Sequence, residues 1–134
     1  MRRKPKLEAA MRWFRRGRGR APDPWDTEEN ELAGDIEAVR KIRSFCDAAS
    51  EIARIVGNGL GGPVEKKRYE RAAKAAMHAA LKIADDPMRD AALRRIIDLC
   101  VSANHLKTAQ TLLGAIQTVS IREVVLKEHP VLRP

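Results

Sequence analysis

The sequence predicts an all-α domain: four to five antiparallel helices that form a small bundle or two stacked helical hairpins, preceded by a flexible basic N-terminal arm. Three observations lead to this fold class. Apolar residues recur at three- and four-residue spacing through most of the chain after residue 32. Glycine and proline, eight and seven residues, cluster between these periodic segments. Aromatic residues make up only 4% of the chain, so the core of this single domain must be aliphatic and alanine-rich.

The N-terminal arm holds the net charge of the chain. Residues 1–20 contain nine Lys or Arg residues and one acid, which gives +8, the formal charge of the whole protein. We expect residues 1–25 to form a disordered basic arm and linker, residues 26–129 the helical domain, and residues 130–134 a frayed tail. The arm residues expected to contact an anionic partner are Arg2, Arg3, Lys4, Arg12, Trp13, Phe14, Arg15, Arg16, Arg18 and Arg20.

Several partners suit this arm. Arginine and lysine beside two aromatic rings fit nucleic acid, through phosphate contacts and base stacking. The same residues fit an anionic membrane surface or an acidic patch on a protein. Within the chain, residues 21–39 hold seven acids and no base, so the arm could also pair with this segment. A solubilising tail without a partner is the plainest alternative.

The first expected helix begins between Asp26 and Asp35 and ends at Gly57-Asn58-Gly59. Its apolar positions keep a three- to four-residue step: Leu32, Ile36, Val39, Ile42, Cys46, Ala49, Ala53 and Val56. We interpret both Cys46 and Cys100 as small buried core residues, because a disulfide framework needs more cysteines in so short a chain.

Four further helices follow. We expect the second from about residue 64 to 84, the third from 87 to about 103 with Asp86 as its N-cap, and the fourth from 106 to 116. Asn104 suits a left-handed C-cap after the third helix. Ser120 and Glu123 are spaced as a capping box for a fifth helix ending near residue 127.

A faint internal repeat lies at an offset of 33 residues. It pairs Ala76 with Ala109, Ala80 with Leu113, Ile83 with Ile116, Met88 with Ile121, Arg89 with Arg122, Asp90 with Glu123 and Leu93 with Leu126. The shared unit is a helix end, a tight turn and an Arg-acid step into the next helix. Through the segments 80–85 and 89–93, the chain resembles tetratricopeptide-like α-solenoid repeats over about residues 70–127. The resemblance implies a protein–protein adaptor, although the Trp-Leu-Gly-Tyr pattern of that family is absent and a compact bundle explains the same residues.

The second helix carries a cationic stripe. Five residues fall within one arc of its surface: Lys67, Arg71, Lys74, His78 and Lys82. Tyr69, Ala73, Ala76, Ala80 and Ile83 lie on the opposite side, which we expect to be core. The stripe could follow the phosphates of a nucleic acid, or it could be an ordinary solvated face.

Catalytic patterns are not found in the sequence. His78, His105 and His129 share no metal-ligand spacing with a cysteine or a carboxylate, and the glycines of residues 57–62 lack the Lys and Ser/Thr of a P-loop. We therefore expect no catalytic residues, no metal ligands and no cofactor, so that the protein is not an enzyme.

The sequence favours a non-enzymatic, cytoplasmic interaction or adaptor protein. It would present a helical-hairpin surface to a protein partner, with the arm adding electrostatic docking. The alternative is a nucleic-acid-binding protein that uses the arm and the stripe of the second helix. Only Trp13 and Phe14 interleave with bases, which favours the protein partner, while an anionic membrane surface ranks third. A homodimer is also open, because a two-hairpin unit would leave apolar ends.

Overall fold

The computed structural model describes residues 23–26 and 34–134, so the basic and aromatic residues predicted for the arm lie outside it. The described residues form five α-helices and two 3-10 turns, and none of them is in a strand. The helices are α1 (Asp35–Gly57), α2 (Pro63–Leu81), α3 (Asp86–Ser102), α4 (Leu106–Ala115) and α5 (Val119–Glu128), with turns η1 (Pro24–Asp26) and η2 (Pro130–Leu132). The predicted all-α class is confirmed. None of these helices is both long and apolar enough to span a bilayer.

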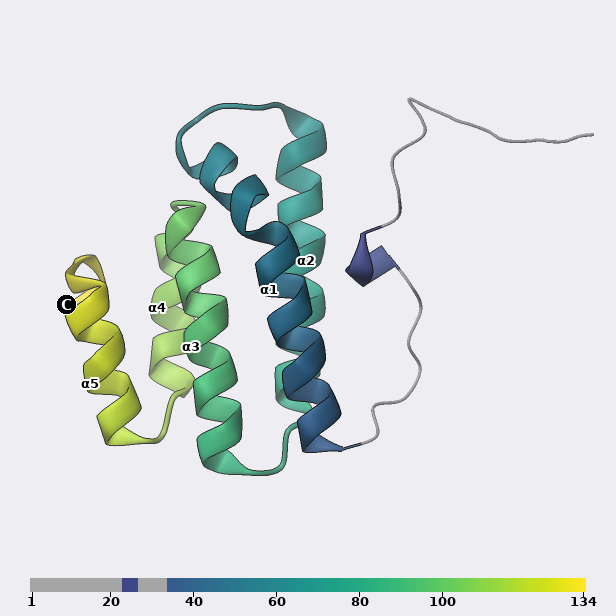
Figure 1. Cartoon of the computed structure of the whole chain (residues 1–134). Helices are drawn as coiled ribbons and strands as arrows, with labels where there is room; N and C mark the ends of the chain where they lie inside the picture. Colours follow the sequence, from purple (N-terminus) through teal and green to yellow (C-terminus); the bar gives the residue numbers. More distant parts are fainter. Residues whose placement is uncertain (1–22, 27–33) are drawn as a thin grey trace, which may run out of the picture.

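Consecutive helices run in opposite directions. As Figure 1 shows, α1, α3 and α5 ascend in the same direction, while α2 and α4 descend behind them. α1 packs against both α2 and α3, and α3 in turn packs against α4, so α1 and α3 occupy the centre of the domain. α5 lies at the edge and makes fewer contacts with α3.

The core is aliphatic and rich in alanine. Six large aliphatic residues of the hairpin junctions are buried: Ile83, Leu93, Ile96, Leu99, Leu112 and Ile116. The expected inner face of α2 is also buried, with Tyr69, Ala73, Ala76 and Ala80 against the neighbouring helices. Small side chains allow α1 and α2 to approach closely and bury an extended seam. One expectation for α1 is wrong, since Ile36 is 69% exposed in its first turn.

The offset of 33 residues is a repeat of local structure. The α2–α3 and α4–α5 turns have N-caps at Asp85 and Thr118, which are 33 residues apart. The Ile83 amide donates to the carbonyl of Ala80, and the Ile116 amide donates to that of Leu113, both at 3.1 Å. Arg89 donates to the carbonyl of Ile83 over a long 3.5 Å, and Arg122 donates to that of Ile116 over 2.5 Å.

A carboxylate from a preceding helix closes each of these turns. Asp35 accepts hydrogen bonds from the amides of Ala84 and Asp85 at 2.9 and 3.0 Å. Asp90 accepts from the equivalent amides of Gln117 and Thr118 at 3.1 and 2.8 Å. Each carboxylate neutralises backbone donors that the helix ends leave unpaired. Two helix–turn–helix units thus repeat, while kinship to the tetratricopeptide-like families stays a prediction.

Several helix ends differ from the sequence-based expectation. α2 ends at Leu81, three residues early, and the N-cap of α3 is Asp85 rather than Asp86, with the Asp85 carboxylate accepting from the amide of Met88 at 3.0 Å. The expected capping box at Ser120 is wrong, because Thr118 is the N-cap of α5 and Ser120 lies inside the helix. Asn104 has a φ of 60°, which confirms its predicted left-handed conformation, and it directly follows Ala103, the C-cap of α3.

Both ends of the helical domain extend beyond the expected boundaries. Trp25, assigned by sequence to the arm, is buried and packs edge-on against Phe45 with ring centroids 6.5 Å apart. Asp23 accepts two hydrogen bonds from Arg68 of α2, at 3.0 and 2.7 Å. At the other end, where the sequence predicts fraying, Leu132 is only 2% exposed. Residues 23–26 and 130–132 therefore belong with the helical domain.

Gly57, the last residue of α1, lies directly against the backbone at the end of α3. A Cβ at this position would lie 1.8 Å from the carbonyl oxygen of Ser102, which is a backbone atom that cannot turn aside. We expect Gly57→Ala to lower the free energy of unfolding by about 1–3 kcal/mol through overpacking. Gly114→Ala is the matched control, because no heavy atom lies within 4 Å of its added Cβ. That variant should be neutral or stabilising in the same urea unfolding series, and equal losses in both variants would contradict this packing.

Candidate functional site

A groove of about 520 Å³ runs along the seam between α1 and α3. Its lining comes from three helices that all point in one direction. The residues are Val39, Ile42 and Arg43 from α1, Met88, Ala91, Ala92, Arg94, Arg95 and Asp98 from α3, and Ile121 from α5. A smaller recess of about 180 Å³ shares Arg95 and Asp98 with it and continues toward Ser50 and Ser102. Together they form a charged channel over the centre of the domain.

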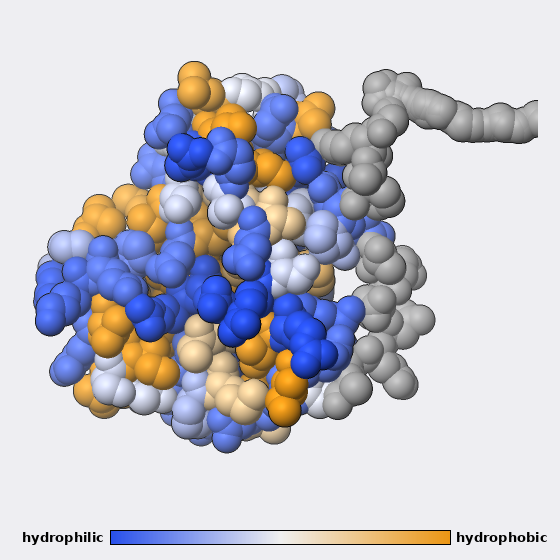
Figure 2. All heavy atoms as spheres, in the orientation of Figure 1, coloured by the Kyte–Doolittle hydropathy of each residue, from blue (hydrophilic) through white to orange (hydrophobic). Residues whose placement is uncertain are grey.

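Helical spacing explains why these residues meet. On α1 the lining positions of the two recesses step through 39, 42, 43, 46, 47 and 50, which is one stripe of a helix. On α3 the lining positions are 88, 91, 92, 94, 95, 98, 99 and 102, which again follow one side of the helix. Aliphatic side chains of both stripes contribute to the packed seam, and the longer arginines reach the rim. Figure 2 shows this as a band of the most hydrophilic residues over α3 and α1, with hydrophobic residues exposed on either side.

Two of the three arginines in the groove have no acidic partner within the described part of the chain. Arg43 and Arg95 are exposed and form no ion pair there. Arg94 instead donates to both oxygens of Glu128, its Nε lying 3.2 Å from Oε1. This pairing lowers the pKa of Glu128. The acid that lines the groove is Asp98, whose Oδ1 lies 2.6 Å from Nε2 of His129. The groove therefore offers two guanidinium groups to an anion.

The buried reactive groups are not prepared for chemistry. Burial raises the pKa of the Cys46 thiol to about 12 and also raises the pKa of Cys100, so both stay protonated at neutral pH. Burial likewise raises the pKa of Tyr69, whose hydroxyl lies 3.2 Å from Nδ1 of His105. A protonated thiol or phenol is a poor nucleophile, and these groups are best explained as core.

The structure keeps the predicted cationic stripe away from the groove. Four of its residues are exposed on α2, as expected, the fifth is exposed at its C-cap, and none lines the groove: Lys67, Arg71, Lys74, His78 and the C-cap Lys82. Nε of Arg71 lies 3.8 Å from Oδ1 of Asp26 in a partly exposed ion pair. No residue of the stripe lines the groove, the smaller recess or the pocket beside Tyr69 and His105. The arm residues predicted to contact an anionic partner lie outside the described residues.

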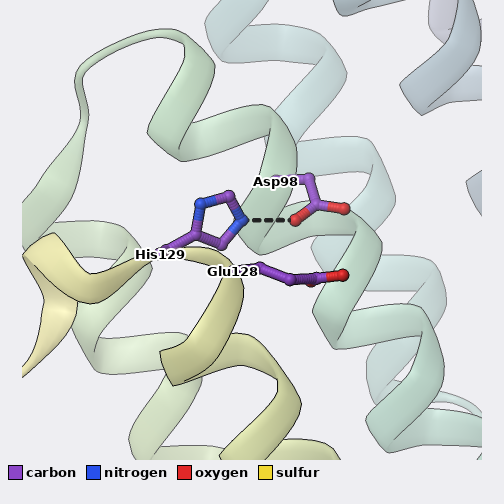
Figure 3. A group of neighbouring side chains, drawn as sticks. All are labelled: Asp98, Glu128 and His129. Atoms are coloured by element: carbon purple, nitrogen blue, oxygen red, sulfur yellow. Dashed lines mark hydrogen bonds and ion pairs between the residues drawn. The ribbon is translucent and has the colours of Figure 1, made fainter.

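A second cluster forms where α5 ends beside α3. Asp98, Glu128 and His129 bring two carboxylates and an imidazole together, with ligand atoms all within 4.8 Å of one another. Figure 3 shows the imidazole pointing at Asp98 and the Glu128 side chain lying beside it. No metal ligands are predicted from the sequence, in which no histidine has metal-ligand spacing to a cysteine or a carboxylate. Asp98 lies 31 residues before His129, and only the fold brings the two together.

Sequence analysis missed Arg43, Arg95 and Asp98 as candidate site residues. Each sits at the border of an apolar stripe, and the Arg94-Arg95 pair is visible in the sequence as a local excess of charge. Only the packing of α1 against α3 brings these borders together. Comparisons of the chain with family models, curated proteins and solved structures find no match.

Proposed function

We propose that this protein is a non-enzymatic interaction protein whose groove between α1 and α3 binds an acidic segment of a protein partner. One observation carries the proposal: Arg43 and Arg95, with no acidic partner in the described residues, stand beside an apolar lining on neighbouring helices. A guanidinium offers a planar pair of donors that matches a carboxylate. The lining of Val39, Ile42 and Met88 adds contact area for aliphatic side chains.

The size of the groove sets the class of ligand. A volume of about 520 Å³ accommodates a few side chains rather than a folded domain. A short segment that alternates acidic and aliphatic residues would place carboxylates on the two arginines and apolar groups on the seam. Such recognition of acidic motifs by clustered arginines is a recurring mode of peptide binding. The arm, with nine bases in residues 1–20, would speed the encounter with the same acidic partner.

The proposal is tested with fluorescent peptides that carry Asp or Glu at alternating positions with Leu or Val between them. The peptides are first selected against the full chain and then titrated by fluorescence anisotropy. Arg43→Ala combined with Arg95→Ala should weaken binding by at least about 100-fold, because each charge-assisted hydrogen bond contributes about 1.5–3 kcal/mol and the variant removes one from each arginine.

The matched control combines Lys67→Ala with Lys74→Ala. Like the groove variant, it removes two positive charges, but it takes them from the exposed stripe of α2 and leaves the groove intact. We expect it to weaken peptide binding by no more than about 2-fold near 150 mM salt, where exposed charges are screened beyond about 8 Å. A control that weakens binding as much as the groove variant would place the site elsewhere.

Nucleic-acid binding is the second candidate, and the exposed stripe of α2 favours it. Five cationic or titratable side chains follow one face of that helix without entering the groove. If nucleic acid is the partner, the triple change of Lys67, Arg71 and Lys74 to Ala should flatten the slope of log affinity against log salt by about two units. The groove variant should then leave nucleic-acid binding unaltered. Sub-micromolar binding abolished by the triple change would favour this candidate over the acidic segment.

A further inference from the structure

Three side chains with metal-binding atoms converge at the end of α5. Glu128 is the last residue of α5, His129 follows it, and Asp98 faces them from α3. Nε2 of His129 lies 2.6 Å from Oδ1 of Asp98, and all three ligand atoms lie within 4.8 Å of one another. The cluster is the one group of this kind that the described ranges 23–26 and 34–134 contain.

Its spacing is close to that of a coordination shell. Zn²⁺ binds imidazole nitrogen and carboxylate oxygen at about 2.0–2.2 Å, so two ligands of a tetrahedral ion lie about 3.3–3.5 Å apart. The observed ligand atoms need to move by little more than an ångström to reach this spacing. The contact between Nε2 of His129 and Oδ1 of Asp98 is shorter, at 2.6 Å, because it is a direct hydrogen bond that a bound metal ion would replace.

We propose that Asp98, Glu128 and His129 bind a divalent transition-metal ion of the Zn²⁺ type, which joins the end of α5 to α3. An imidazole among the ligands favours Zn²⁺ over Mg²⁺ or Ca²⁺, which prefer oxygen ligands alone. Three protein ligands leave the remaining coordination positions to water, since the side chains of Asp98 and Glu128 are 51% and 39% exposed. The proposal does not depend on what binds in the groove.

Arg94 competes with the metal for Glu128. Both carboxylate oxygens of Glu128 accept hydrogen bonds from the Arg94 guanidinium. The Arg94 guanidinium and the Glu128 carboxylate form an ion pair, which a bound dication would weaken. Removing the guanidinium should therefore tighten metal binding, a result that a merely structural role of these residues would not give.

The site is tested on the full chain by isothermal titration calorimetry with ZnCl₂. Co²⁺ replaces Zn²⁺ in a parallel titration, because its visible absorption reports imidazole and carboxylate coordination directly. We expect His129→Gln and Asp98→Asn each to weaken Zn²⁺ binding by at least about 10-fold. Loss of a residue that only hydrogen-bonds to a metal ligand already lowers metal affinity by about 10- to 100-fold, and loss of the ligand itself should lower it at least as much. Arg94→Leu should tighten binding by about 3- to 10-fold.

His78→Gln is the control, because His78 is exposed on α2 and far from the cluster in sequence. It should bind Zn²⁺ as the unaltered chain does. Zn²⁺ should also raise the Tm of the unaltered chain, which gives a second readout if a variant folds poorly. Equal affinity in the unaltered chain and His129→Gln, or the absence of a Co²⁺ absorption band, would overturn the proposal.

Discussion

Replacing Asp90 with alanine should lower the free energy of unfolding by about 3–5 kcal/mol, because it removes a fully buried carboxylate oxygen that accepts three hydrogen bonds. The donors are the amides of Gln117 and Thr118 and the hydroxyl of Thr118, at 3.1, 2.8 and 2.6 Å. The substitution leaves all three without an acceptor in the α4–α5 turn. Urea unfolding followed by circular dichroism measures the loss.

Two comparison variants sharpen this prediction. Asp90→Asn should cost less than alanine, because the amide oxygen can still accept from the turn and the other oxygen of Asp90 has no partner among the described residues. Asp35→Ala removes the equivalent contact at the α2–α3 turn, which is exposed to water, and should cost about 1 kcal/mol. Equal losses in the free energy of unfolding for Asp90→Ala and Asp35→Ala would contradict the prediction, because burial of the Asp90 contact at the α4–α5 turn would then add no stability.

Leu99→Ala should cost about 2–5 kcal/mol, the usual loss for a large-to-small change in a packed core. Leu99 is 4% exposed on α3, the helix that contacts α1, α2, α4 and α5. Neighbouring backbones cannot close the resulting cavity, since α3 is held from several sides. The same unfolding measurement gives the value.

Leu81→Ala serves as the comparison for Leu99, because Leu81 is 76% exposed at the end of α2. It should change stability by less than about 0.5 kcal/mol, as exposed substitutions commonly do. A loss below that value for Leu99→Ala would mean that α3 is rotated about its axis relative to the structure described above.

Periodicity predicted the fold because each helix buries one continuous apolar stripe. Helix boundaries were less accurate where two adjacent residues could serve as the cap. Asp85 and Asp86 both precede Pro87, and the sequence cannot show that the Asp85 carboxylate reaches the amide of Met88. The cap at Thr118 was missed for a different reason: its hydroxyl is engaged by Asp90, 28 residues earlier, and this contact exists only after α3 packs near the turn.

The candidate sites could not be predicted because each combines borders of separate helices. Arg43 and Arg95 lie 52 positions apart in the sequence, and neither falls on a periodic charged stripe such as that of α2. The sequence therefore drew attention to Lys67, Arg71 and Lys74, whose periodicity is local. Asp98 and His129 meet only because α5 returns to the middle of α3. Contacts between segments that are distant in the sequence form each site, and the periodicity of a single helix does not reveal such contacts.

Binding of an acidic segment in the groove between α1 and α3 can be followed residue by residue by NMR. The ¹⁵N-labelled full chain is titrated with the selected acidic peptide, and the shift of each backbone amide is followed. We expect the largest shifts on the lining positions, from 39 to 50 on α1 and from 88 to 102 on α3, and we expect them to vanish in the Arg43→Ala, Arg95→Ala variant. Shifts confined to residues 67–82 of α2 or to the N-terminal arm, with the groove amides unchanged, would contradict binding in the groove.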